Sequence, residues 1–204
     1  MNEQLRNKLV RMAARDLRVR EELAATGELF DGYSAKMEAV HLENADALEA
    51  VIDTGGGWPG ASMIGADGAE AAWLVAMHAI SRPAFQRRCL ALLEEAAAAG
   101  EAEAYQPAYL FDRIALFEGR PQRYGTQSDW NEEGKMEIGP LEDAACVNEL
   151  RASVGLAPLE NLVWENEETR EHAPKDFARR RREYEEWKVK VGWIEAAGVG
   201  RDEK

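Results

Sequence analysis

The sequence predicts a mainly α-helical protein: a compact multi-helix bundle with a small β-hairpin at about 122–138 and a C-terminal amphipathic helix. Three observations support this fold class. Apolar residues recur at helical spacing in most segments, and glycine or proline marks the short connections between them. One stretch near the middle instead alternates like short strands. With 204 residues, 46% of them hydrophobic, the chain has enough apolar material for a substantial core.

Five helices are expected in the first 120 residues. The first, at about 3–25, carries an apolar stripe that includes Leu9 and Val19. The Gly-rich run 53–60 cannot continue a helix, and it carries the aromatic residue Trp58. The segment from Asp67 to about Ile80 is apolar on most sides, which is typical of a central helix. We expect the five helices at about 3–25, 35–52, 67–80, 83–99 and 103–118.

The second half of the chain has a different sequence pattern. Residues 122–128 and 135–138 are short extended segments, and the turn residues 131–134 between them predict the hairpin. A helix at 141–154 and a short helical stretch through Trp164 follow. The chain therefore divides into a helical bundle domain with the hairpin, 1–165, and a charged linker with the C-terminal helix, 166–204.

Composition excludes several classes of protein. The chain has 38 acidic and 25 basic residues and a net charge of −13, which argues against nucleic-acid binding. No apolar run approaches the roughly 18–20 residues that a membrane-spanning helix needs, and the charged N-terminus does not resemble a signal peptide. Cys89 and Cys146 show no metal-binding spacing, so we expect buried thiols in a cytoplasmic protein.

Four polar residues interrupt the apolar stripes of the expected helices: Asp16, Asn44, His78 and Asp112. Each has apolar neighbours three or four residues away, so each lies on the inward face of its helix. A buried polar group without a partner costs about 1–3 kcal/mol. These four side chains should therefore find one another, water or a ligand inside the bundle.

Two interpretations of these residues are open. In the first they form a polar site, with His78 as the proton-transfer group oriented by Asp112 or Asp16. In the second they form a purely structural polar network, with Asp16 paired to Arg20 one turn on. We predict neither a metal nor another cofactor, because the chain has three histidines and no His-x-x-x-His or Glu-x-x-His pair.

Arginine and amide side chains are concentrated just before the expected hairpin. Arg113, Arg120 and Arg123 form a local positive cluster beside the proposed pocket, within or just before the run Arg120–Gln127. In an acidic protein this cluster is the best place for a carboxylate or phosphate. On a strand, Gln122, Tyr124 and Thr126 would share one face. The alternative is that Arg113 and Tyr124 only attach the hairpin to the bundle.

Several short motifs occur together in one order: Gly-Trp-Pro at 57–59, His-Ala at 78–79, Tyr-Leu-Phe-Asp-Arg at 109–113, Gln-Arg-Tyr-Gly-Thr-Gln at 122–127 and Asn-Glu-Leu-Arg-Ala-Ser-Val-Gly-Leu at 148–156. Over about 5–165 the chain resembles a bacterial family of unknown function marked by the sequence Tyr-Gly-Thr-Gln. The resemblance implies no reaction. Its motif positions coincide with the inward polar residues, which favours a pocket. The expected ligand-binding residues are Arg20, Asn44, Trp58, Arg113, Gln122, Tyr124, Thr126 and Gln127.

Two functions follow from these observations. The protein is either an enzyme that acts on a small polar or anionic molecule, or a non-catalytic module that binds a ligand or another protein. The aromatic stripe of the last helix, which includes Phe177, Tyr184 and Trp187, favours a homodimer through that helix.

Overall fold

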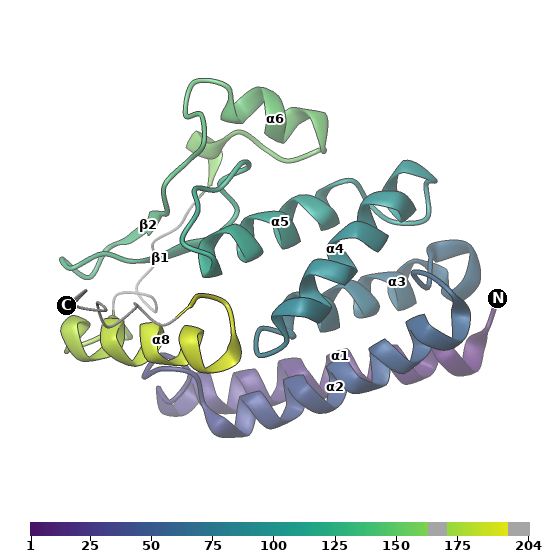
Figure 1. Ribbon diagram of the computed structural model, residues 1–204, viewed down its shortest axis with the longest axis horizontal. Helices are drawn as coiled ribbons and strands as arrows, with labels where there is room; N and C mark the ends of the chain where they lie inside the picture. Colours follow the sequence, from purple (N-terminus) through teal and green to yellow (C-terminus); the bar gives the residue numbers. More distant parts are fainter. Residues whose placement is uncertain (163–170, 196–204) are drawn as a thin grey trace, which may run out of the picture.

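A computed structural model describes residues 1–162 and 171–195, and it confirms a mainly helical fold with one small antiparallel hairpin (Figure 1). The helices are α1 (Glu3–Thr26), α2 (Ala35–Gly55), α3 (Ala61–His78), α4 (Pro83–Ala98), α5 (Tyr105–Phe117), α6 (Val147–Ser153) and α8 (Phe177–Val191), with a 3-10 turn at Leu159–Asn161. The strands are β1 (Ser128–Trp130) and β2 (Met136–Ile138). Within the described ranges, no helix is both long and apolar enough to cross a membrane.

Helix α3 lies at the centre of the bundle, as its composition predicts. It packs against α1, α2, α4 and α5. Small buried residues on this helix, including Ala72 and Ala76, let its neighbours approach closely. The backbone at Gly65 is not helical, with φ 76° and ψ 164°, so the regular part of α3 begins near the predicted start at Asp67.

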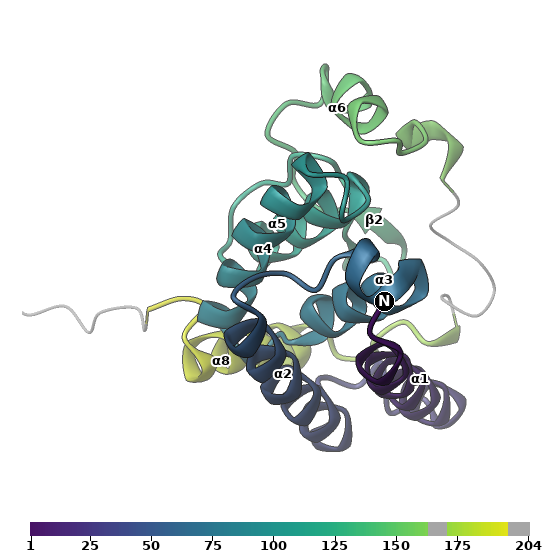
Figure 2. The same ribbon diagram turned by 90° about the vertical axis from the view of Figure 1, so that its right-hand side faces the viewer.

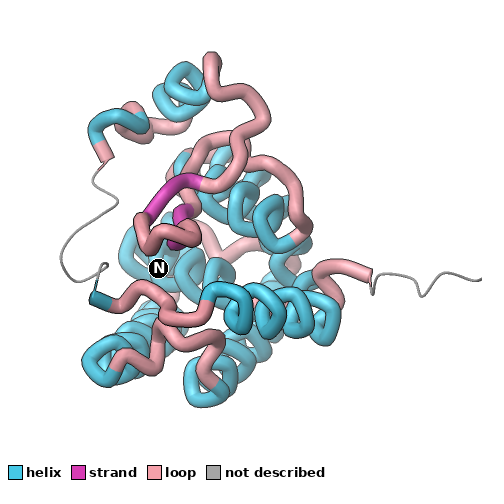
Figure 3. The backbone as a smooth tube through the Cα atoms, turned by 90° about the vertical axis from the view of Figure 1, so that its left-hand side faces the viewer, coloured by secondary structure: helices cyan, strands magenta, loops and turns pink. Residues whose placement is uncertain are grey.

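The bundle has two sides. Helices α1 and α2 form one side, and α6 stands on the opposite side, beyond α4 and α5 (Figures 1 and 2). The hydrophobic core lies between them and includes Leu9, Leu48, Val75, Leu93 and Leu110, all of which are fully buried or nearly so. Helix α8 and the hairpin lie at the same end of the molecule (Figure 3).

The first strand of the hairpin begins later than predicted. It covers Ser128–Trp130, whereas we expected 122–128; the second strand, Met136–Ile138, agrees with the prediction. The backbone N–H groups of Arg123, Tyr124 and Thr126 donate to the carboxylate of Asp112, so they cannot form a strand ladder. A long-range contact therefore overrides the extended pattern in this stretch.

The helix predicted over 141–154 is shorter in the structure. Residues 141 and 142 instead pair with the chain near Gln122, since the Glu142 N–H donates to the Gln122 carbonyl at 2.7 Å. Asp143 then accepts hydrogen bonds from the N–H groups of Ala145 and Cys146, forming a turn before α6. Cys146 is exposed in this turn, contrary to our expectation of a buried thiol, whereas Cys89 is buried.

The aromatic stripe of the C-terminal helix packs on the protein's own core. The rings of Trp187 and Phe117 are 5.5 Å apart, and the indole N–H of Trp193 donates to the Ile80 carbonyl at 2.7 Å. Tyr184 and Trp187 are only partly exposed. The stripe therefore does not favour an intermolecular interface, and the homodimer stays a prediction.

Residues 163–170 of the predicted linker lie outside the described residues, so the division at residue 165 also stays a prediction.

Candidate functional site

A cavity of about 840 Å³ lies between the bundle, the hairpin and α8. Its wall is built from α1, the connection between α1 and α2, the inner faces of α2 and α3, one residue of α5, both strands and α8. His41, His78, Arg20 and Arg113 all line it. Helices that are distant in the sequence thus present imidazole and guanidinium groups to one space.

A buried carboxylate joins the two histidines at this wall. Asp16 on α1 is 1% exposed, and its Oδ1 lies 2.9 Å from Nδ1 of His78 at the end of α3. Its other oxygen, Oδ2, lies 3.3 Å from Nε2 of His41 on α2. The hydroxyl of Tyr33 lies 2.7 Å from Nδ1 of His41 and so extends the cluster by one residue.

Burial and the neighbouring groups set the charges of this cluster. Burial alone would raise the pKa of Asp16, but its contacts with His41 and His78 outweigh that effect and hold the pKa well below its usual value. Burial lowers the pKa of His78 to about 4, although the contact with Asp16 opposes the change. Burial also raises the pKa of the Tyr33 hydroxyl. At neutral pH the cluster is therefore an ionised carboxylate with a neutral His78.

Helical spacing predicted that Asp16 and His78 lie together, but it did not lead us to His41 and Tyr33. His41 follows Met37 by four residues and precedes Asn44 by three, so it lies on the inward face of α2, and the same helical spacing could have identified it. Tyr33 lies in the connection before α2, where no periodicity applies.

Asn44, which we expected to bind a ligand, connects two helices of the bundle. It is buried, and its Nδ2 donates to the Met12 carbonyl at 3.4 Å. The contact ties α2 to α1 next to the cluster, and Asn44 does not line the cavity.

Two arginines face the cavity without a carboxylate partner among the described residues. Arg113 on α5 donates through Nε to Oε1 of Gln127 at 3.0 Å and through Nη1 to the Met77 carbonyl at 2.9 Å. Its pKa is lowered to about 10, first by burial and then by the nearby positive charge of Arg20. Two neighbouring guanidinium groups favour an anion between them.

The other aspartate that interrupts a stripe, Asp112, is 0% exposed and builds a loop. Its two oxygens accept hydrogen bonds from the N–H groups of Arg123, Tyr124 and Thr126 and from the Thr126 hydroxyl, at 2.8–3.2 Å. No described contact joins Asp112 to His78. Asp16 is therefore the carboxylate that orients His78.

The run Gln122–Gln127 forms a buried amide network rather than a row of ligand-binding side chains. The side chain of Gln122 bonds to the backbone of Gln127 through both of its polar atoms, at 2.7 and 2.9 Å. Gln127 in turn donates to the Thr126 hydroxyl and accepts from Arg113. The loop built on Asp112 thus orients the Arg113 guanidinium in the cavity wall.

The remaining predicted ligand residues lie elsewhere. Trp58 is buried in the main core, and Tyr124 packs edge-on against Phe111, so neither lines the cavity. Arg120 and Arg123, which we expected beside the pocket, pair with Glu118 and Glu142. Of the arginines in that stretch, Arg113 alone faces the cavity within the described part of the chain.

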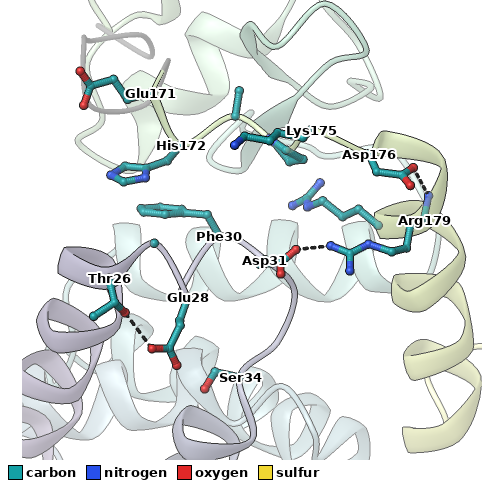
Figure 4. A pocket seen from close by; sticks show the side chains of 14 residues that line it. Thr26, Glu28, Phe30, Asp31, Ser34, Glu171, His172, Lys175, Asp176 and Arg179 are labelled. Carbon is teal, nitrogen blue, oxygen red and sulfur yellow. Dashed lines mark hydrogen bonds and ion pairs between the residues drawn. The ribbon is translucent and has the colours of Figure 1, made fainter.

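A second hollow, of about 650 Å³, lies between the connection of α1 to α2 and the residues that lead into α8 (Figure 4). Two contacts cross or line it: Arg179 forms an ion pair with Asp31, and the Thr26 hydroxyl donates to Glu28. The ring of His172 stacks on Phe30, with centroids 4.5 Å apart. These contacts attach the segment before α8 to the bundle and leave no buried polar atom of the hollow without a partner among the described residues.

The Asp16 cluster is also suited to holding a metal ion. One ligand atom from each of Asp16, His41 and His78 lies within 4.8 Å of the other two. Local histidine spacing, on which we based the expectation of no metal, cannot detect ligands that come from three separate helices.

Comparison with known proteins gives a family and no reaction. A family model described as a family of unknown function, DUF6624, matches residues 3–171. No curated protein and no solved structure matches the chain. The matched range contains Asp16, His41, His78 and Arg113 and ends before α8. The chain therefore belongs to the DUF6624 family of unknown function.

Proposed function

We propose that this protein is an enzyme that acts on a small anionic molecule bound in the 840 Å³ cavity, and that the reaction takes place beside Asp16, His41 and His78. The observation that carries this proposal is the fully buried Asp16 carboxylate, which contacts two imidazoles that both line the cavity. Such a convergence of a carboxylate and imidazoles in a cavity is typical of catalytic sites.

The incomplete bonding of the cluster supports a functional role. The Oδ2 atom of Asp16 and the Nε2 atom of His41 are buried and have no hydrogen-bond partner within the described residues. A structural network gains stability when every buried polar atom is paired. These two atoms lie 3.3 Å from each other without forming a hydrogen bond, and such atoms beside a cavity are available to a ligand.

The arginines indicate the charge of the substrate. Arg113 is held in place by Gln127 and by the Met77 carbonyl, and it shares the cavity with Arg20. Two acidic residues of the same wall form ion pairs: Asp129 makes a two-point pair with Arg180 at 2.9 Å, and Asp31 contacts Arg179. A carboxylate or phosphate group is the chemical partner that fits Arg20 and Arg113.

The test has a binding arm and a catalytic arm. Isothermal titration calorimetry with inorganic phosphate and with oxalate should detect binding to the full chain, and Arg113→Gln should weaken it by at least about tenfold. Arg120→Gln is the matched control, because Arg120 is exposed and pairs with Glu118 outside the cavity. Equal affinities in the two variants would contradict the assigned anion site.

The catalytic arm uses chromogenic phosphate and carboxylate esters as probes. We expect slow hydrolysis by the wild type and loss of hydrolysis in His78→Gln, with phosphate affinity retained. Anion binding to the wild type without turnover of any ester would favour the alternative function, a non-catalytic ligand-binding module.

A further inference from the structure

The two unpartnered atoms of the cluster lie side by side. Oδ2 of Asp16 and Nε2 of His41 are 3.3 Å apart, and each belongs to a side chain that is more than nine-tenths buried. No hydrogen bond of good geometry joins the carboxylate oxygen to the ring nitrogen at this distance. Both atoms can therefore bind the same cation.

The spacing of the three side chains fits a metal ion. Two ligands bound to zinc at about 2.0–2.1 Å lie about 3.4 Å apart at the tetrahedral angle and about 2.9 Å apart at a right angle. The observed separations are 3.3 Å from Oδ2 of Asp16 to Nε2 of His41 and 2.9 Å from Oδ1 of Asp16 to Nδ1 of His78, so each histidine contacts a different oxygen of the carboxylate. One ligand atom from each of the three residues lies within 4.8 Å of the other two, so the three side chains reach a common ion if they move closer together.

Tyr33 supplies the support that a metal-binding histidine commonly has. Such a histidine donates its second ring N–H to a neighbouring acceptor, which fixes the ring and directs the other nitrogen to the metal. The Tyr33 oxygen lies 2.7 Å from Nδ1 of His41, so it can accept that proton while Nε2 points toward Asp16.

From these contacts we infer that Asp16, His41 and His78 bind one divalent transition-metal ion of the zinc class at the wall of the cavity. Two imidazoles and a carboxylate suit such ions, whereas calcium and magnesium prefer sites made of oxygen ligands. Three protein ligands leave at least one coordination position for water or substrate, as in catalytic rather than structural zinc sites.

The role of the ion as a partner of the substrate rests on the proposed function, while the site itself rests on the geometry alone. His41 and His78 line the same cavity as Arg20 and Arg113. An anion held by the arginines could therefore reach the open position of the ion.

The experiment uses the full-length protein freed of metal with a chelator. Calorimetric titration with Zn²⁺ should give one site per chain, and Asp16→Asn, His41→Gln and His78→Gln should each weaken it by at least about 100-fold, with Tyr33→Phe weakening it by about 10–100-fold. Titration with Co²⁺ should give the visible absorption of a four- or five-coordinate site, which these variants lose.

The chain offers a matched control in its third histidine. His172 stacks on Phe30 outside the cluster, so His172→Ala should bind Zn²⁺ as tightly as the wild type. Circular dichroism and urea denaturation of each variant without metal separate a lost ligand from a lost fold. A variant that does not fold is replaced by Asp16→Glu, which keeps the charge and should shift the cobalt spectrum while still binding.

Three outcomes would overturn the inference: no zinc binding by the wild type, stoichiometric binding that survives in all three cluster variants, or binding that disappears in His172→Ala. The proposed function fails separately. If zinc binds at the cluster but Arg113→Gln leaves anion binding and ester hydrolysis unchanged, the metal site stands and the proposed substrate class is wrong. If phosphate binding depends on Arg113 and no metal binds, the anion site stands without the ion.

Discussion

Asp112 and Asp16 are both completely buried aspartates on inward helix faces, yet their surroundings differ. Asp112 accepts hydrogen bonds on both oxygens, and every donor comes from the loop that it organises. Asp16 has histidines as its contacts, and its Oδ2 has no hydrogen-bond partner among the described residues. A carboxylate whose two oxygens both accept hydrogen bonds stabilises the structure around it. A carboxylate with an oxygen that accepts none, next to a cavity, can instead bind a ligand.

The two regions also act together. The loop folded by Asp112 carries Gln127, which accepts a hydrogen bond from Arg113. Arg113 faces the cavity that His41 and His78 line. The network around Asp112 therefore positions Arg113, the residue that we propose binds an anion beside the Asp16 cluster. The following changes should separate the structural role of Asp112 from the proposed role of Asp16.

The largest effect on stability should come from Asp112→Ala. It leaves three loop N–H groups without their acceptor, and each unsatisfied buried group costs about 1–3 kcal/mol, so the free energy of unfolding should fall by about 3 kcal/mol or more. Urea denaturation followed by circular dichroism measures this. A loss below about 1 kcal/mol would mean that the loop does not depend on Asp112.

Asp16→Asn should affect metal binding more than stability. The amide keeps the shape of the side chain and one acceptor for His78 but loses the charge, so the unfolding free energy of the metal-free protein should fall by about 2 kcal/mol, less than in Asp112→Ala. Zinc affinity should fall by at least about 100-fold, because the charged ligand is lost. A stability loss as large as that of Asp112→Ala would instead identify Asp16 as a structural residue.

Gln127→Ala tests the connection between the two regions. It removes the acceptor that holds Nε of Arg113, and we expect phosphate affinity to fall by about tenfold with a stability loss of about 1 kcal/mol. Zinc affinity should not change. If zinc and phosphate binding fall together, the loop supports the whole site rather than Arg113 alone.

The smallest effect should come from Arg120→Gln. Arg120 is exposed and pairs with Glu118 next to the same loop, and such surface pairs contribute about 0–1 kcal/mol. Calorimetry and urea denaturation should therefore show unchanged phosphate binding and a stability change within about 0.5 kcal/mol. Weaker phosphate binding would show that the positive cluster expected from the sequence does extend to Arg120.

Local patterns predicted the helices well because each inward face repeats at helical spacing. The bounds of α1 and the central position of α3 follow from such patterns. The same spacing identified Asp16 and His78 as inward polar residues, and it would have identified His41 had the rule been applied to every residue of α2.

The sequence by itself determined that polar side chains had to be buried in an apolar bundle. The tertiary structure alone decided which of them meet. Asp112 and Asp16 occupy equivalent positions on their helices, so periodicity cannot tell them apart, but one faces the loop 123–126 and the other faces His41 and His78. Helical spacing records the direction of a side chain around its own axis, whereas the partner depends on how the helices pack against one another. The strand predicted at 122–128 failed for the same reason, because the carboxylate that accepts hydrogen bonds from its N–H groups lies on a helix, 11 and 12 residues before Arg123 and Tyr124.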